Sequence, residues 1–284
     1  MKYIYLDHNV YCAYIKKEDA FPLLPEKIDS IDKKRYLFPY SPAHIEEIAE
    51  ITNSNNTSKD KTEFIAKLLH GISSLSNGKE IFPNLDGPTT IVTESPLSCF
   101  GRVFATLNMT EFAKENERRI YAFKNKGTYE NYYKEESLIE HDEYFTHDNM
   151  RKRHRIDIDS IKKLNEKQLM SSEPVLSLFE EFIKQRESVI SRDDVFEGFK
   201  HYHHLVEQKI DCYFRFLEIV GYYTEPYKKY VSRMHDVTHA IYATKANFFI
   251  TNDNNFYKKT KATYEFFKIP TIVLTVDEFL SFEF

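Results

Sequence analysis

Acidic residues stand at the ends of two short apolar runs near opposite ends of the 284-residue chain. Asp7 ends the run KYIYL, and Asp253 closely follows the run NFFIT, residues 247–251. A buried strand gains nothing from a carboxylate at its tip, because burying an unpaired charge is costly. A site that binds a cation does need carboxylates there, so this pattern indicates cation chemistry.

Two further acids lie on the helices that flank these runs. A second apolar run, 35–41, ends at Ser41, and the sequence then predicts a helix from Pro42 to about Ile51 that carries Glu47. Asp236 lies on a helix expected within 225–246, directly before the NFFIT run. If the apolar runs are parallel strands, their carboxyl ends share one edge of a sheet, where ligands bind.

Four carboxylates gathered at one edge repel one another unless a cation neutralises them. Hard divalent ions with oxygen ligands, Mg²⁺ or Mn²⁺, suit such a site. One or two such ions, held by acids and water, can hydrolyse a phosphodiester bond. The residues therefore predict a metal-dependent phosphodiester hydrolase.

Four segments together resemble the motifs of PIN-domain nucleases. LDHNVY resembles the opening motif, and SPAHIEEI resembles the second, with a glutamate six residues after the serine. HDVTHAIYATKANFFITNDNNF resembles the third and fourth motifs, and IVLTVDEFL the closing strand and half-helix. The resemblance covers residues 1–55 and 225–284, and a long insertion between them departs from the compact members of the family.

The resemblance implies a three-layer α/β/α fold with a parallel central sheet, and Mg²⁺- or Mn²⁺-dependent hydrolysis of RNA. By position, the implied metal ligands are Asp7, Glu47, Asp236 and Asp253. Asn9 would then orient Asp7, and the hydroxyl of Ser41 or Thr251 would hold a carboxylate. His239 shares a helix face with Asp236 and either supports this site or is an ordinary core histidine.

Each acid also has a plain structural interpretation. Asp7 can simply cap the helix that follows it, and Asp253 can be a turn residue. Glu46 and Glu47 can be first-turn acids that favour the helix dipole, an interpretation we prefer for Glu46.

The chain divides into three segments by composition: a first half of the core (1–55), a mostly helical insertion (56–224) and a second half of the core (225–284). Strands and helices alternate in the outer segments, as in a parallel α/β sheet. The middle segment mixes polar tracts with helix-length amphipathic stretches, and no repeat with a fixed period is evident.

A net charge of −5 and a pI near 6.1 argue against a protein that coats nucleic acid nonspecifically. Any nucleic-acid contact must therefore be local. The candidates lie in the run MRKRHR, 150–155, and just after Asp253: Arg151, Lys152, Arg153, Arg155, Lys258 and Lys259. The alternative for the basic run is a solvated linker.

Three widely spaced cysteines without a CxxC motif indicate a reducing compartment and no structural zinc. HYHH, 201–204, offers no evident third zinc ligand and is better explained as a solvated helix face, and His235 as a surface residue. The absence of a signal peptide and of a membrane-length apolar run predicts a cytoplasmic protein that does not contact a membrane.

The leading hypothesis is a metal-dependent endoribonuclease, of a toxin-like or defence type. Its partners would be an RNA, such as tRNA or another structured RNA, and a restraining or regulatory protein, by analogy with toxin–antitoxin ribonucleases. A homodimer is expected by analogy with compact family members. The alternatives are a non-catalytic protein- or RNA-binding protein on the same scaffold and a hydrolase of small phosphates, although no glycine loop that would cradle a nucleotide is present.

Overall fold

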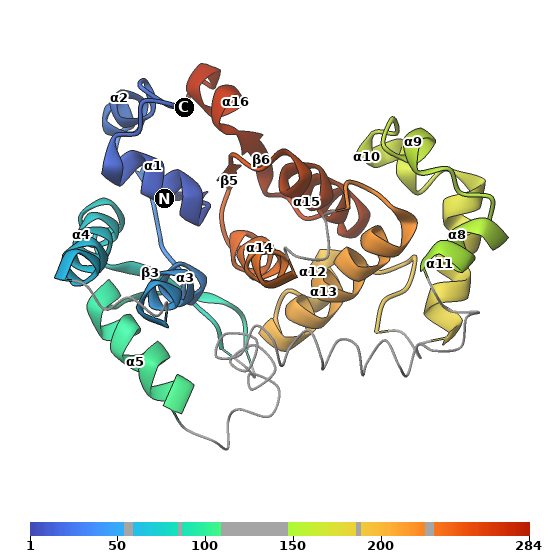
Figure 1. Ribbon diagram of the computed structural model, residues 1–284, viewed down its shortest axis with the longest axis horizontal. Helices are drawn as coiled ribbons and strands as arrows, with labels where there is room; N and C mark the ends of the chain where they lie inside the picture. The colour runs from blue at the N-terminus through green and yellow to red at the C-terminus, as the bar shows by residue number, and fades with distance from the viewer. Residues whose placement is uncertain (54–58, 85–86, 109–146, 186–188, 225–229) are drawn as a thin grey trace.

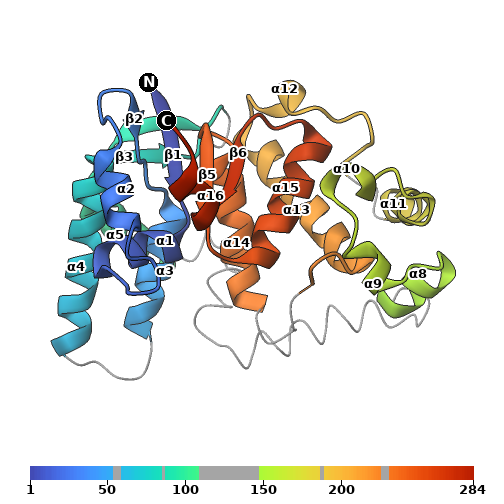
Figure 2. The same ribbon diagram turned by 90° about the horizontal axis from the view of Figure 1, so that it is seen from above.

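A four-stranded parallel sheet forms the centre of the molecule (Figures 1 and 2). The computed structural model describes residues 1–53, 59–84, 87–108, 147–185, 189–224 and 230–284. In spatial order the strands are β2 (Tyr36–Leu37), β1 (Lys2–Leu6), β5 (Phe248–Thr251) and β6 (Ile272–Thr275). All neighbouring strands pair in parallel. The two central strands are β1, from the start of the chain, and β5, from near its end. The expected α/β class is confirmed.

Both faces of this sheet are buried, which explains the continuous apolar character of its strands. Side chains alternate between faces along a strand. Tyr5 and Phe249 accordingly belong to one hydrophobic core, whereas Ile4, Leu6 and Ile250 belong to the other. Figure 2 shows helices on both sides of the sheet.

Helices from the first 108 residues, with the last helix, enclose the core that contains Ile4 and Leu6. They are α1 (His8–Lys16), α2 (Leu24–Ser30), α3 (Pro42–Asn53), α4 (Lys59–Ser76), α5 (Pro96–Asn108) and α16 (Val276–Ser281).

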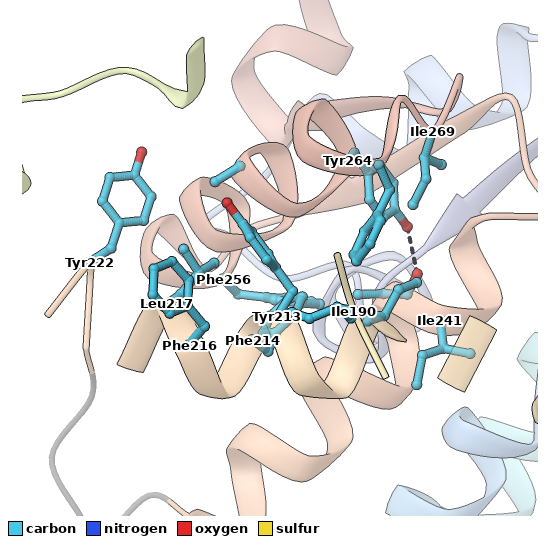
Figure 3. Packing of buried hydrophobic residues seen from close by; sticks show 14 of the residues in the cluster. Ile190, Tyr213, Phe214, Phe216, Leu217, Tyr222, Ile241, Phe256, Tyr264 and Ile269 are labelled. Atoms are coloured by element: carbon cyan, nitrogen blue, oxygen red, sulfur yellow. Dashed lines mark hydrogen bonds between the residues drawn. The ribbon is translucent and has the colours of Figure 1, made fainter. Parts of the chain in front are cut away.

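The remaining helices supply the core that contains Tyr5. They are α8 (His147–Arg153), α9 (Ile158–Ile161), α10 (Glu166–Leu169), α11 (Glu173–Gln185), α12 (Phe196–Phe199), α13 (His203–Val220), α14 (Tyr230–Ala243) and α15 (Asn254–Phe267). Aromatic rings dominate this core, and Figure 3 shows Tyr213 of α13 facing α15, where its ring stacks on that of Phe266. Tyr264 of α15 donates a hydrogen bond to the Ala240 carbonyl of α14, at 2.6 Å, which ties these two helices together (Figure 3).

The segment 56–224 is mostly helical where it is described, but it also contains a β-hairpin that the sequence analysis did not predict. Its strands, β3 (Lys79–Phe82) and β4 (Thr90–Thr93), pair antiparallel. The segment contributes α4 and α5 to one core and α8 to α13 to the other. It therefore packs against both sides of the sheet.

The strand order reverses beside β1, and this reversal positions the candidate site. The chain runs from β1 to β2 on one side, and β5 and β6 lie on the other side of β1. In open parallel sheets, ligands bind where the order reverses, at the carboxyl ends of the strands. Here those ends carry Asp7 after β1 and Asp253 after β5.

Candidate functional site

Asp7 is held in place at the carboxyl end of β1. Its side chain accepts hydrogen bonds from the His8 backbone N–H at 2.8 Å and from the Thr251 hydroxyl at 2.9 Å. Only 3% of the residue is exposed. Burial and the charges of Glu47 and Asp253 outweigh these hydrogen bonds and raise the pKa of Asp7 to about 7.

Thr251 connects Asp7 to Asp253. The Thr251 hydroxyl donates to Asp7 and accepts a hydrogen bond from the Asp253 backbone N–H at 3.2 Å. Asp253 in turn caps α15 by accepting from the Phe256 N–H at 2.8 Å. Asp253 thus has a structural role, as the N-cap of α15 rather than as a turn residue, and Thr251 holds a carboxylate as the resemblance implied.

Glu47, on α3, and His239, on α14, contact each other close to Asp7. The His239 Nε2 is 2.7 Å from Glu47 Oε1 and 4.0 Å from Asp7 Oδ1. A carboxylate can only accept, so Nε2 carries the proton and donates to Glu47. Burial and the neighbouring His235 lower the pKa of His239 to about 3, so its ring is neutral.

A chain of side-chain hydrogen bonds continues from His239 to Ser41. The Tyr5 hydroxyl is 2.7 Å from His239 Nδ1 and 2.6 Å from the Ser41 hydroxyl. Because Nε2 carries the proton of the neutral ring, Nδ1 must accept from Tyr5, and Tyr5 then accepts from Ser41. This chain, Ser41–Tyr5–His239–Glu47, fixes the direction in which Glu47 is held. We call it the Tyr5 relay.

His44 fixes the other end of the Tyr5 relay. Its Nδ1 accepts from the Ser41 N–H at 3.0 Å, and its Nε2 donates to the Leu6 carbonyl at 2.7 Å. Burial and the neighbouring His239 lower the pKa of His44, consistent with a neutral ring. Ser41 therefore serves Tyr5 and His44 rather than a carboxylate.

The prediction that His235 lies on the surface is wrong. Only 13% of its side chain is exposed, and its Nε2 is 2.9 Å from Glu50 Oε1. Burial alone would lower the pKa of His235, but Glu50 and the charges of Glu47 and Glu46 raise it to about 9. His235 is therefore a partly buried cation beside Glu50.

For Asp236 and Asn9, the described contacts do not include the roles that the resemblance implied. Asp236 lies partly buried on α14, between His235 and His239 in sequence. Asn9 is exposed on the first turn of α1, and the described hydrogen bonds to the Asp7 carboxylate come from His8 and Thr251 instead. Asn9 lines a cavity beside the site.

The basic run expected to grip RNA lies on α8, at the opposite end of the molecule from α1 and α4 (Figures 1 and 2). Arg151 donates to the Ile219 carbonyl at 3.0 Å, and Arg153 pairs with Glu181 at 2.5 Å. Lys152 and Arg155 are exposed. The run is therefore partly structural and not adjacent to the acids.

The two lysines after Asp253 also differ. Lys258 is partly exposed, with its amine over the Tyr257 ring, whereas Lys259 is buried and pairs with Glu218 at 3.0 Å. Lys259 does not lie on a surface that RNA can reach, so its expected role in RNA contact is wrong. Its position on the inner face of α15 gives it a structural role.

The HYHH segment is not a solvated helix face. His203 begins α13, is buried and lies 2.9 Å from the Thr89 hydroxyl through Nδ1. His201 precedes the helix.

No helix among the described residues is long and apolar enough to cross a membrane.

The acids supply carboxylate oxygens, which are the ligands that hard divalent cations prefer. In the described part of the chain, no group of three or more His, Cys, Asp or Glu side chains is arranged to hold a metal ion. Burial and the charges of Glu47 and Asp253 disfavour ionisation of Asp7, and carboxylate oxygens in this situation are ligands of the kind that Mg²⁺ or Mn²⁺ would bind.

Sequence reasoning brought Asp7, Glu47, Asp253, Thr251 and His239 to one site, but it missed Tyr5 and His44. Tyr5 lies two residues before Asp7, and His44 three residues after Ser41. A polar residue in the middle of a buried strand, or on the first turn of a buried helix, was the available signal.

Comparison with protein-family models, curated proteins and solved structures found no match to this chain.

Proposed function

We propose that the protein is a metal-dependent ribonuclease of the PIN-like type. Asp7, Glu47, Asp236 and Asp253 would hold Mg²⁺ or Mn²⁺ at the carboxyl edge of the sheet. One observation carries the proposal: Asp7 is buried and held by two hydrogen bonds, yet nearby acids oppose its ionisation. Such an arrangement is unfavourable in the bare protein and becomes favourable when a cation binds.

A bound divalent ion would lower the pKa of a water and stabilise charge on the phosphate oxygens. The side chains of this protein do the positioning. Thr251 orients the Asp7 carboxylate, and the neutral His239 orients Glu47. His235, a cation beside Glu50, balances part of the acidic charge.

The choice of RNA as substrate rests on the resemblance to PIN-domain nucleases, together with the local rather than general distribution of basic residues. Lys152, Arg155 and Lys258 are the sequence-predicted contacts that remain accessible to RNA. A restraining protein partner, as in toxin–antitoxin ribonucleases, and a homodimer belong to the same proposal by analogy.

The test is cleavage of total tRNA, single-stranded RNA and single-stranded DNA in Mn²⁺, Mg²⁺ or EDTA. We expect cleavage of RNA only with a divalent ion, and a loss of about 100-fold or more in the Asp7→Asn/Asp236→Asn double variant. Asp193→Asn, which removes an exposed acid from a loop outside the site, is the control.

Cleavage that survives in the double variant would refute the proposal. Failure to cut any RNA or DNA, together with failure to bind a divalent ion, would instead support the alternative of a non-catalytic binding protein on this scaffold.

A further inference from the structure

A cavity of about 390 Å³ lies directly beside the acids. Two asparagines place it there: Asn9 follows Asp7 by two residues, and Asn252 lies between Thr251 and Asp253. Its volume is near the lower end of the range of about 300–1,000 Å³ that is typical of small-molecule sites. A group bound in the cavity would therefore be small and would lie next to the proposed metal ligands.

Three helices form its walls. His8, Cys12 and Lys16 line it from α1 at four-residue spacing, so they share one face of that helix. Phe64 and Leu68 line it from α4, also four residues apart. Ile51, one turn beyond Glu47, lines it from α3. The walls thus join the acidic site to an apolar surface.

The cavity is close to neutral, in contrast to the acids beside it. Lys16 pairs with Glu18 at 3.4 Å, so these two lining charges offset each other. Burial raises the pKa of Cys12 to about 11, which leaves a thiol rather than a thiolate. An anion gains little here, whereas an uncharged group can enter without an electrostatic penalty.

The remaining lining groups suit a flat heteroaromatic ring. Phe21 and Phe64 supply aromatic surface, on which a base can stack. Asn9 and Asn252 are exposed, and each amide offers both donors and acceptors that can pair with the edge of a base. Lys16, which is exposed, lies over the Phe64 ring at 5.2 Å.

We propose that this cavity binds one nucleobase of the RNA, in the nucleotide next to the phosphate that the acids would act on. The inference rests on the proposed function for its choice of RNA, and it adds a site that selects the substrate by base. Asn252 is the main candidate for reading the base, because its own loop carries Asp253.

The test uses the full-length chain in EDTA, so that it does not depend on cleavage. Adenosine, guanosine, cytidine and uridine are titrated separately, with amide chemical-shift changes as the readout, and inorganic phosphate serves as a comparison probe. We expect at least one nucleoside to bind, with shifts in α1 and α4. Asn252→Ala and Phe64→Leu should each weaken that binding about 5-fold or more.

Two control variants keep the test specific. Asn254→Ala removes an exposed amide two residues further on, outside the cavity lining, and should bind the nucleoside as wild type does. Asp193→Asn, which removes an exposed acid that does not line the cavity, should also retain nucleoside binding.

Absence of nucleoside binding, or equal binding by wild type, Asn252→Ala and Phe64→Leu, would overturn the inference. Shifts with phosphate but not with nucleosides would overturn it as well, since they would reveal an anion site at Lys16. Nucleoside binding without RNA cleavage would leave the cavity assignment standing while the ribonuclease proposal fails, so the two failures are distinguishable.

Discussion

Asp7 determines how the stability of the bare protein should depend on pH. Its pKa is about 7 in the folded chain, against 3.8 for an ordinary aspartate. Between these values the folded state keeps a proton that the unfolded state has released. The contribution of Asp7 to stability is therefore fully present below about pH 4 and is lost as the pH rises through 7.

Asp7→Asn should remove this dependence. In EDTA at pH 8 we expect the variant to be more stable than wild type by up to about 4 kcal/mol, and the difference should shrink toward pH 4. Urea unfolding from pH 4 to 8 measures it. If the wild-type protein instead becomes more stable than the variant as the pH rises, the pKa of Asp7 is not raised in the folded state.

Tyr5→Phe tests whether the Tyr5 relay positions Glu47. The variant leaves Ser41 and His239 without their shared partner, so stability should fall by about 1–2 kcal/mol. The cleavage rate should fall about 10-fold, with KM unchanged, because RNA does not touch Tyr5.

Tyr11→Phe is the matched control for the relay. Tyr11 is equally buried, and its hydroxyl donates to the Phe38 carbonyl at 2.7 Å, outside the relay. It should lose similar stability but keep its cleavage rate. If both variants lose the same activity, the relay has no positioning role.

At the scale of single elements, substitutions at the two adjacent lysines of α15 should have different effects, one on stability and the other on RNA binding. Lys259→Met breaks the pair between buried Lys259 and partly buried Glu218 and should cost about 3 kcal/mol of unfolding free energy. Lys258→Met should leave stability nearly unchanged but reduce the salt dependence of RNA binding. Thermal unfolding and salt-dependent affinity measurements distinguish them, and the reverse pattern would contradict the burial of Lys259.

The elements of the sheet were predictable because each carries a strong local signal. β1 and β5 are continuous apolar runs buried on both faces, and Ser41 with Pro42 marks the start of α3. The hairpin of β3 and β4 lacked such a signal. Buried Glu80 in β3 pairs with Arg102 of α5 at 2.6 Å, and no local pattern reveals a partner that far along the chain.

At the scale of the whole molecule, the order of strands and helices predicted that Asp7 and Asp253 would lie at the same edge of the sheet, but not how their side chains are held. Tyr5 and His239 are far apart in sequence, and their contact exists only because β1 and α14 pack together. The same limit applies to basic residues: the sequence showed a positive run on α8, whereas only the fold shows its distance from the acids and its internal ion pairs.

The most direct test of the account is equilibrium binding of Mn²⁺, followed by the loss of the electron paramagnetic resonance signal of the free ion. This measurement does not require the right RNA to be known. We predict that wild type and Asp193→Asn bind Mn²⁺ with equal affinity, and that Asp7→Asn binds at least about 10-fold more weakly. Equal binding by wild type and Asp7→Asn, or no binding by wild type, would contradict a cation site at the carboxyl edge of the sheet.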